Sequence, residues 1–175
     1  MALALLTAEP ALAQAPAASN AASVDIEKAW NDLDAGDPAT REAARKQIEA
    51  QPLILWTIRA LGETRPWASI EALRALCEAC PASQAETLRP HLCEGVTTLR
   101  IEEMSADQVL SVVQLAHEVC TRFGAPTDDE RRQMIDLWTH LLPRFASRAG
   151  AKSADPALGK VVSEIEALIG FLSKP

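Results

Sequence analysis

The residues best suited to chemistry are four cysteines, namely Cys77, Cys80, Cys93 and Cys120. Cys77 and Cys80 form a C-x-x-C pair, a spacing used by dithiol redox sites and by one half of a zinc site. However, no second C-x-x-C follows, and both residues continue the apolar stripe of a predicted helix. The pattern favours cysteines that pack in a core. The alternative interpretation of these cysteines is a functional one: a helical metal-binding or redox domain centred on Cys77, Cys80 and Cys120.

Signatures of other enzyme classes are missing from the sequence. His117 has no second histidine four residues later, as a metalloprotease helix requires. The chain contains neither a glycine-rich phosphate loop nor a G-x-S-x-G turn. We therefore expect no catalytic activity, no cofactor and no metal ion.

The composition predicts an all-α protein. Hydrophobic residues make up 48% of the 175 residues, and there are 3 Phe, no Tyr and only 7 Gly. Ala, Leu and Glu are abundant, and these residues favour helices over strands. The net charge of −7, with lysines and arginines scattered along the chain, opposes binding to nucleic acid or to anionic membranes.

Apolar residues recur at helical spacing in eight runs that end at proline, glycine or capping residues. The expected helices cover about 26–33, 38–48, 52–61, 66–80, 83–99, 105–123, 127–145 and 156–172. Their starts carry Asp-Pro pairs at Asp37 and Asp155, and capping boxes at Ser83 with Glu86, Ser105 with Gln108, and Thr127 with Glu130. Pro143 is expected to kink or end the seventh helix.

The third expected helix contains aliphatic residues and one tryptophan whose positions decide how the helix is oriented. Its inward face is predicted to consist of Ile54, Leu55, Ile58 and Leu61. The four tryptophans are expected mainly in the core, but the position of Trp56 is left open: it either packs inward or lies at an exposed edge, where an aromatic side chain would contact a partner.

Two sequence features favour stacked helical hairpins, with a helical bundle as the alternative. A shift of 28 residues aligns Leu33 with Leu61, Pro38 with Pro66, Ala44 with Ala72 and Ile48 with Leu76. The stretch 33–48 also resembles the HEAT repeat, whose turn contains Asp and Pro and whose second helix contains Arg and Ala at fixed places. The resemblance implies a HEAT-like α-α array over residues 23–175. It also implies a hydrogen-bonding ladder between neighbouring repeats that involves Asp37 and Arg41.

A stacked array predicts one disulfide. Helices 66–80 and 105–123 would run parallel as second members of consecutive hairpins, and both carry cysteines in their final turn. Cys93 would lie about 15 Å from that end, at 1.5 Å per helical residue, which is too far for a bridge. We therefore expect a bridge from Cys77 or Cys80 to Cys120.

The N-terminal residues 1–22 resemble a secretory signal peptide followed by a flexible lead-in. An apolar run ends in Ala13-Gln14-Ala15, which is an A-x-A cleavage pattern, although no basic residue precedes the run. The apolar run is too short to span a bilayer. The expected location is the periplasm or the cell exterior.

These observations predict a non-enzymatic, exported scaffold that binds a protein partner. In arrays of this kind the second helices of the hairpins line one surface. The residues expected to contact a partner there are Arg45, Glu49, Glu71, Arg74, Gln114, Glu118 and Glu164.

Overall fold

The computed structural model describes residues 25–151 and 155–174, and the expected leader 1–22 lies outside these ranges. Every regular element in the described ranges is a helix. The α-helices are α1 (Ile26–Asp32), α2 (Pro38–Glu49), α3 (Thr57–Leu61), α4 (Pro66–Ala79), α5 (Ala85–Thr97), α6 (Ala106–Arg122), α7 (Asp128–Ala149) and α8 (Ala157–Leu172). Three 3-10 turns accompany them: η1 (Leu53–Leu55), η2 (Ala82–Gln84) and η3 (Ile101–Glu103).

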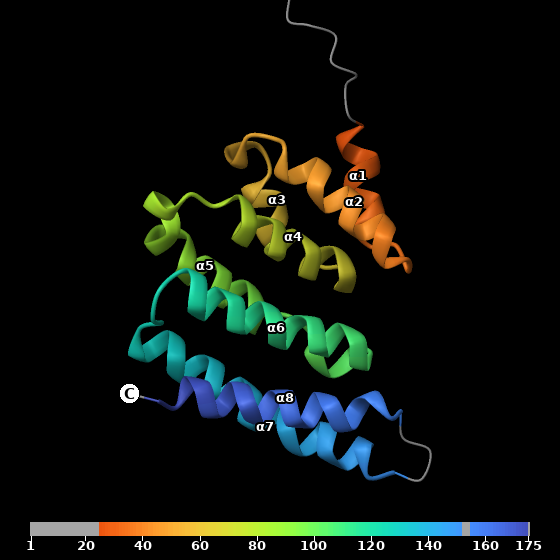
Figure 1. The fold of residues 1–175 in the computed structure, drawn as a ribbon, viewed down its shortest axis with the longest axis vertical. Coiled ribbons are helices and arrows are strands. Elements are labelled where there is room, and N and C mark those ends of the chain that lie inside the picture. Colours follow the sequence, from red (N-terminus) through yellow and green to blue (C-terminus); the bar gives the residue numbers. More distant parts are fainter. Residues whose placement is uncertain (1–24, 152–154, 175) are drawn as a thin grey trace, which may run out of the picture.

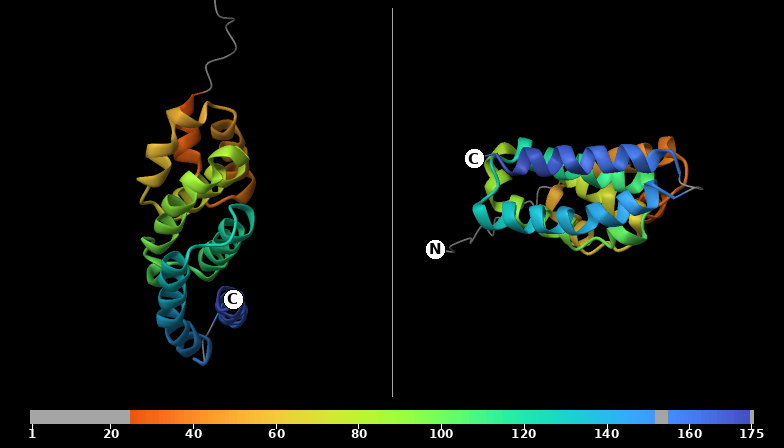
Figure 2. Two further views of the ribbon diagram at one scale, coloured as in Figure 1. Left: turned by 90° about the vertical axis from the view of Figure 1, so that its left-hand side faces the viewer. Right: turned by 90° about the horizontal axis from the view of Figure 1, so that it is seen from below.

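Consecutive helices form pairs that follow one another along the long axis of the molecule (Figure 1). The second helices pack in series, with α2 against α4, α4 against α6, and α6 against α8. Among the first helices, α3 contacts α5, and α5 contacts α7. The side view shows the two rows of helices next to each other (Figure 2). The expected all-α fold of about eight helices is therefore confirmed.

Four of the eight α-helices in the described residues begin at a residue whose side chain caps the helix. The Asp37 carboxylate accepts a hydrogen bond from the Thr40 N–H, and the capping boxes at Ser105 and Thr127 are both formed. The capping box predicted at Ser83 is wrong: Gln84 precedes α5 without a side-chain bond, because Ala82–Gln84 forms the 3-10 turn η2. Pro143 does not end its helix either, since α7 continues to Ala149 with Phe145 buried beyond the proline.

The third expected helix differs most from its prediction. Leu53–Leu55 is a 3-10 turn, and α3 begins only at Thr57. Ile54 and Ile58 are each 86% exposed and Leu55 is 73% exposed, whereas Trp56 is only 2% exposed. Trp56, the largest side chain of the segment, and Ala60, one turn later, face the core. This orientation turns Ile54 and Ile58 toward solvent. The prediction of an inward face at Ile54, Leu55 and Ile58 is therefore wrong, and of the two positions left open for Trp56 the structure has the buried one.

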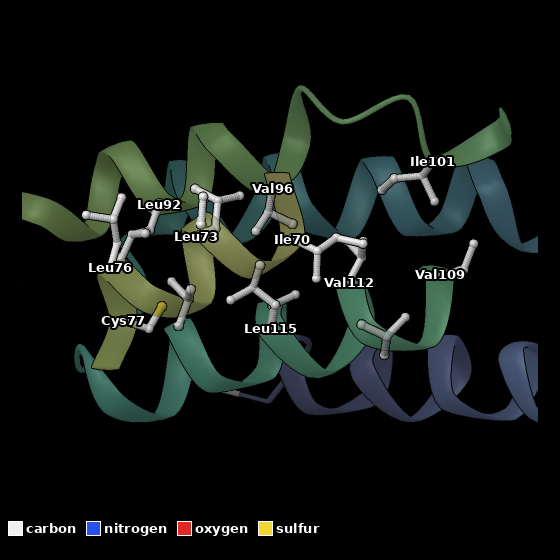
Figure 3. Close-up of a cluster of buried hydrophobic side chains, with 14 of the residues drawn as sticks. Ile70, Leu73, Leu76, Cys77, Leu92, Val96, Ile101, Val109, Val112 and Leu115 are labelled. Atoms are coloured by element: carbon white, nitrogen blue, oxygen red, sulfur yellow. The ribbon is translucent and has the colours of Figure 1, made fainter. Parts of the chain in front are cut away.

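Helix α4 lies in the middle of the array and is buried on nearly all sides. Its side chains Ile70 and Leu73 meet Leu92 and Val96 of α5 and Leu115 of α6 in one cluster (Figure 3). Gly95 allows α5 to approach closely, because a Cβ added there would lie 2.9 Å from Cδ2 of Leu73. This cluster joins the second pair of helices to the third.

Polar contacts join the first pair to the second. The Asp34 carboxylate, in the turn between α1 and α2, accepts hydrogen bonds from the N–H groups of Trp67 (3.1 Å) and Ala68 (3.3 Å) at the start of α4. The Arg65 guanidinium donates to the carbonyl of Trp30 at 3.1 Å. A carboxylate at a helix N-terminus satisfies N–H groups that have no partner within the helix.

Glu63 holds Arg65 in this position. Its carboxylate accepts hydrogen bonds from the Arg65 guanidinium and from the backbone N–H groups of Thr64 and Arg65. The Arg65 side chain is the largest cause that lowers the pKa of Glu63 to about 2. The ionised form of Glu63 is thus favoured in the folded protein.

The position of Trp56 leads to a test of the α3 register. We expect Trp56→Ala to reduce the free energy of unfolding by about 3–5 kcal/mol, because it removes a large buried ring. The neighbouring change Ile54→Ala should alter it by less than about 0.5 kcal/mol, because that side chain is exposed. Urea denaturation of both variants at low protein concentration measures the difference, and a larger loss for Ile54→Ala would contradict the register.

The lowered pKa of Glu63 predicts a pH dependence of stability. Because the folded pKa lies below the unfolded value, the stabilising contribution is complete above pH 4.5 and is lost as the pH falls toward about 2. We expect Glu63→Gln to remove this part of the acid sensitivity. Urea denaturation over a pH series compares it with Glu166→Gln, a change of an exposed carboxylate on α8. Identical pH profiles of the two variants would contradict the assignment.

Candidate protein-binding face

The residues expected to contact a partner all lie on the second helices, which form one continuous row (Figure 2). The structure divides them into two groups. Charged side chains between α2 and α4 form the first group: Arg45, Glu49, Glu71 and Arg74. The second group lines a groove between α6 and α8 and consists of Gln114, Glu118 and Glu164.

Glu71 is the centre of the first group. Its carboxylate lies 3.7 Å from Nε of Arg41, 3.4 Å from Nε of Arg45 and 3.3 Å from Nη1 of Arg74. Glu71 is only 6% exposed. It is therefore not a surface contact residue, and the expectation for Glu71 is wrong because α2 covers it with two arginines.

Arg45 extends the network to the end of α4. It forms ion pairs with Glu49, at 3.2 Å, and with Glu78. Burial alone would lower the pKa of Arg45, but its ion pairs, first with Glu78, raise it above its ordinary value. Burial, followed by the charge of Glu78, raises the pKa of Glu49. These charges are thus used to hold α2 against α4.

The two residues of the expected ladder have different roles. Asp37 accepts hydrogen bonds from the N–H and hydroxyl of Thr40 in its own helix. Arg41 donates to the carbonyls of Ala35 (2.8 Å) and Gly36 (3.0 Å), and its guanidinium lies over the Trp67 ring, 3.7 Å from the centroid. Arg41 therefore reaches the next pair of helices through Trp67 and Glu71, and the carboxylate that bonds to that pair belongs to Asp34.

The groove between α6 and α8 has a volume of about 350 Å³. Val113 and Leu168 are buried and form its floor, and Ala167 and Phe171 contribute further apolar surface. Its polar lining residues are Gln114, His117, Glu118 and Glu164. Sequence reasoning missed His117 and Phe171, whose ring centroids lie 4.6 Å apart and join the two helices.

A larger hollow, of about 740 Å³, lies between the α3–α4 loop and the segment that follows α5. Two of its polar residues have partners beside the hollow: Glu63 binds Arg65, and the Ser69 hydroxyl donates to the carbonyl of Glu63 at 2.7 Å. Its lining also includes Thr64 and the exposed Arg100 and Glu103.

All four cysteines are buried free thiols in the structure. Burial is the largest cause that raises the pKa of Cys77 and Cys93 to about 12 and that of Cys120 to about 11. The thiols therefore stay protonated at neutral pH, which disfavours thiolate chemistry. The bridge from Cys77 or Cys80 to Cys120 stays a prediction.

Within 25–151 and 155–174, no group of three or more His, Cys, Asp and Glu side chains is arranged to hold a metal ion. None of the helices in these ranges combines the length and hydrophobicity needed to cross a bilayer.

The buried network at Glu71 predicts a large effect on stability. We expect Glu71→Gln to lower the free energy of unfolding by about 3 kcal/mol, because it leaves the Arg41 guanidinium without a buried carboxylate and removes one of the three carboxylates that pair with Arg45. The control is Glu42→Gln, which breaks the exposed pair with Lys46 on α2 and should change stability little. Chemical denaturation measures both, and equal effects would contradict the role of Glu71.

Comparison of the chain with known proteins gives no match. The chain matches no protein-family model, no curated protein and no solved structure.

Proposed function

We propose that this chain is a non-enzymatic helical-repeat scaffold that binds a protein partner in the groove between α6 and α8. The observation that carries the proposal is the contrast along the row of second helices. On α2 and α4 the charges are paired with one another, whereas the groove combines an apolar floor with carboxylates that form no ion pair in the described part of the chain.

The chemistry of the groove indicates what it would bind. Glu118 from α6 and Glu164 from α8 supply negative charge beside the apolar surface of Leu168 and Phe171. A protein segment with an apolar anchor flanked by Lys or Arg would match both features. A helix or an extended segment of a partner fits such a site between two helices.

The scaffold class rests on the repeat-like features of the first two pairs. The 33–48 pattern resembles a HEAT repeat, and Arg41 and Asp34 contact the following pair of helices. Arrays of stacked helix pairs present extended surfaces to their partners. We propose a HEAT-like α-α array on these grounds.

The proposal includes export to the periplasm or the cell exterior, on the strength of the A-x-A pattern at Ala13–Ala15. The intact mass of the protein from its host tests this part. A mature chain that begins near Pro16 would support export, and an unprocessed chain would contradict it.

Charge reversal in the groove tests the binding function. The chain with a photo-crosslinking residue at Gln114 first identifies a partner in host extract, and the same residue at Glu166, outside the groove, serves as the control. We expect Glu118→Arg combined with Glu164→Arg to weaken binding of that partner at least about tenfold, because it replaces attraction of basic residues by repulsion.

The matched control for the charge change is Glu166→Arg, which alters the same type of residue on α8 away from the groove lining. It should bind as the unchanged protein does. Calorimetry with the purified partner measures all three affinities, and circular dichroism confirms that the variants fold. Equal affinities of the groove variant and the control would contradict the proposed function.

A further inference from the structure

The N-terminal end of the array carries an exposed apolar surface, which we call the end patch and define as Ile54, Leu55 and Ile58. These three are the exposed large hydrophobic side chains of the described residues. All come from η1 and α3, which lie beside α1 at one end of the molecule (Figure 1). Surface groupings of large apolar side chains commonly mark interaction sites.

The chain cannot bury the end patch by turning the segment over. Trp56 and Ala60 project inward from the same segment and are each 2% exposed. The indole N–H of Trp56 donates to the carbonyl of Gln51 at 3.3 Å, which fixes the ring further. A rotation that buried Ile54 and Ile58 would expose Trp56, so the register of α3 keeps the end patch outside.

A hollow of about 430 Å³ adjoins the end patch between α1 and the η1–α3 segment. Leu55 belongs to both the end patch and the hollow, whose other apolar walls are Ile26, Trp30 and Trp56. The apolar surface at this end is therefore shaped and not merely a row of exposed side chains.

The opposite end of the array has a different surface. The exposed side chains of α7 and α8 are mostly polar or charged, among them Asp136, His140, Arg144, Lys160, Ser163 and Glu166. Head-to-tail stacking of copies would press the end patch against this polar surface. Between the ends of two copies, contact is therefore favoured where end patch meets end patch, which is an isologous contact.

The charges beside the end patch suit such a contact. Arg59 follows Ile58 and donates to both carboxylate oxygens of Glu27, at 2.7 and 3.0 Å. In a two-fold arrangement, Arg59 of each copy would face Glu27 of the other copy, so opposite charges would meet across the contact. The net charge of −7 opposes self-association in general. Glu27 and Arg59 together carry no net charge, so they add no repulsion at this contact.

We propose that two copies of this chain associate end to end, with Ile54, Leu55 and Ile58 at the centre of the interface and Glu27 and Arg59 at its edge. The proposal is independent of the partner bound by the groove between α6 and α8, because that groove is formed by the third and fourth helix pairs and shares no lining residue with the end patch.

Sedimentation velocity of the full chain over a concentration series tests the proposal. The unchanged protein should convert from monomer to dimer as its concentration rises. Ile54→Glu combined with Ile58→Glu should raise the dissociation constant at least about tenfold, because each copy would place two carboxylates at the centre of the contact. Both positions are exposed, so the variant is expected to fold, and circular dichroism checks that it does.

The matched control variant combines Ala146→Glu and Ser163→Glu, two exposed positions of α7 and α8. This variant should dimerise as the unchanged protein does. A full chain that stays monomeric at all concentrations would overturn the proposal. A dimer that the end-patch variant does not weaken would overturn it as well.

A cysteine crosslink tests which ends meet. Because the four native cysteines are buried, Ile54→Cys would supply an accessible thiol. A short bis-maleimide should link Ile54→Cys into covalent dimers and leave Ala146→Cys monomeric. Equal crosslinking of the two variants would show that the contact does not involve the end patch.

Discussion

The structure depends on the burial of helix faces that a single pair of helices cannot cover. Each pair leaves one apolar stripe open, and the next pair along the chain covers it. Helix α4 shows this most clearly, because α2, α3 and α6 pack against it, α5 approaches it at Gly95, and little of its surface is left to solvent. Since hydrophobic burial supplies most of the favourable free energy of folding, the order of the pairs along the chain also sets their order in space.

Electrostatics then distinguishes regions of this otherwise regular array. Between α2 and α4 the arginines and glutamates neutralise one another around Glu71 and leave little free charge. Between α6 and α8 the glutamates face a groove with apolar walls. The same residue types on the same row of helices thus stabilise the fold in one place and, in the part of the chain that the structure describes, form no ion pair in another. Burial and neighbouring charges decide which role each one takes.

Local signals in the sequence were reliable where one interaction within a helix decides the outcome. Caps such as Asp37, Ser105 and Thr127 need only residues three positions apart, so they could be predicted. The same spacing failed at Ser83, where Ala82–Gln84 forms a 3-10 turn instead. The α3 segment could not, because Trp56 competes with Ile54 and Ile58 for the core and only the packing against α1 and α4 decides between them. The groove was predicted in part: Gln114, Glu118 and Glu164 were named, but the contact of His117 with Phe171 depends on the packing of α6 against α8.

An array held together by contacts between successive pairs has few cross-links over its full length. Small tilts at each junction add up, so such a molecule bends more easily along its long axis than a globular core of equal size. The width between α6 and α8 is set only by the local packing of Val113, Leu168 and their neighbours. The array could therefore adjust the spacing of these two helices to differently sized side chains while the tightly paired charges on α2 and α4 remain undisturbed.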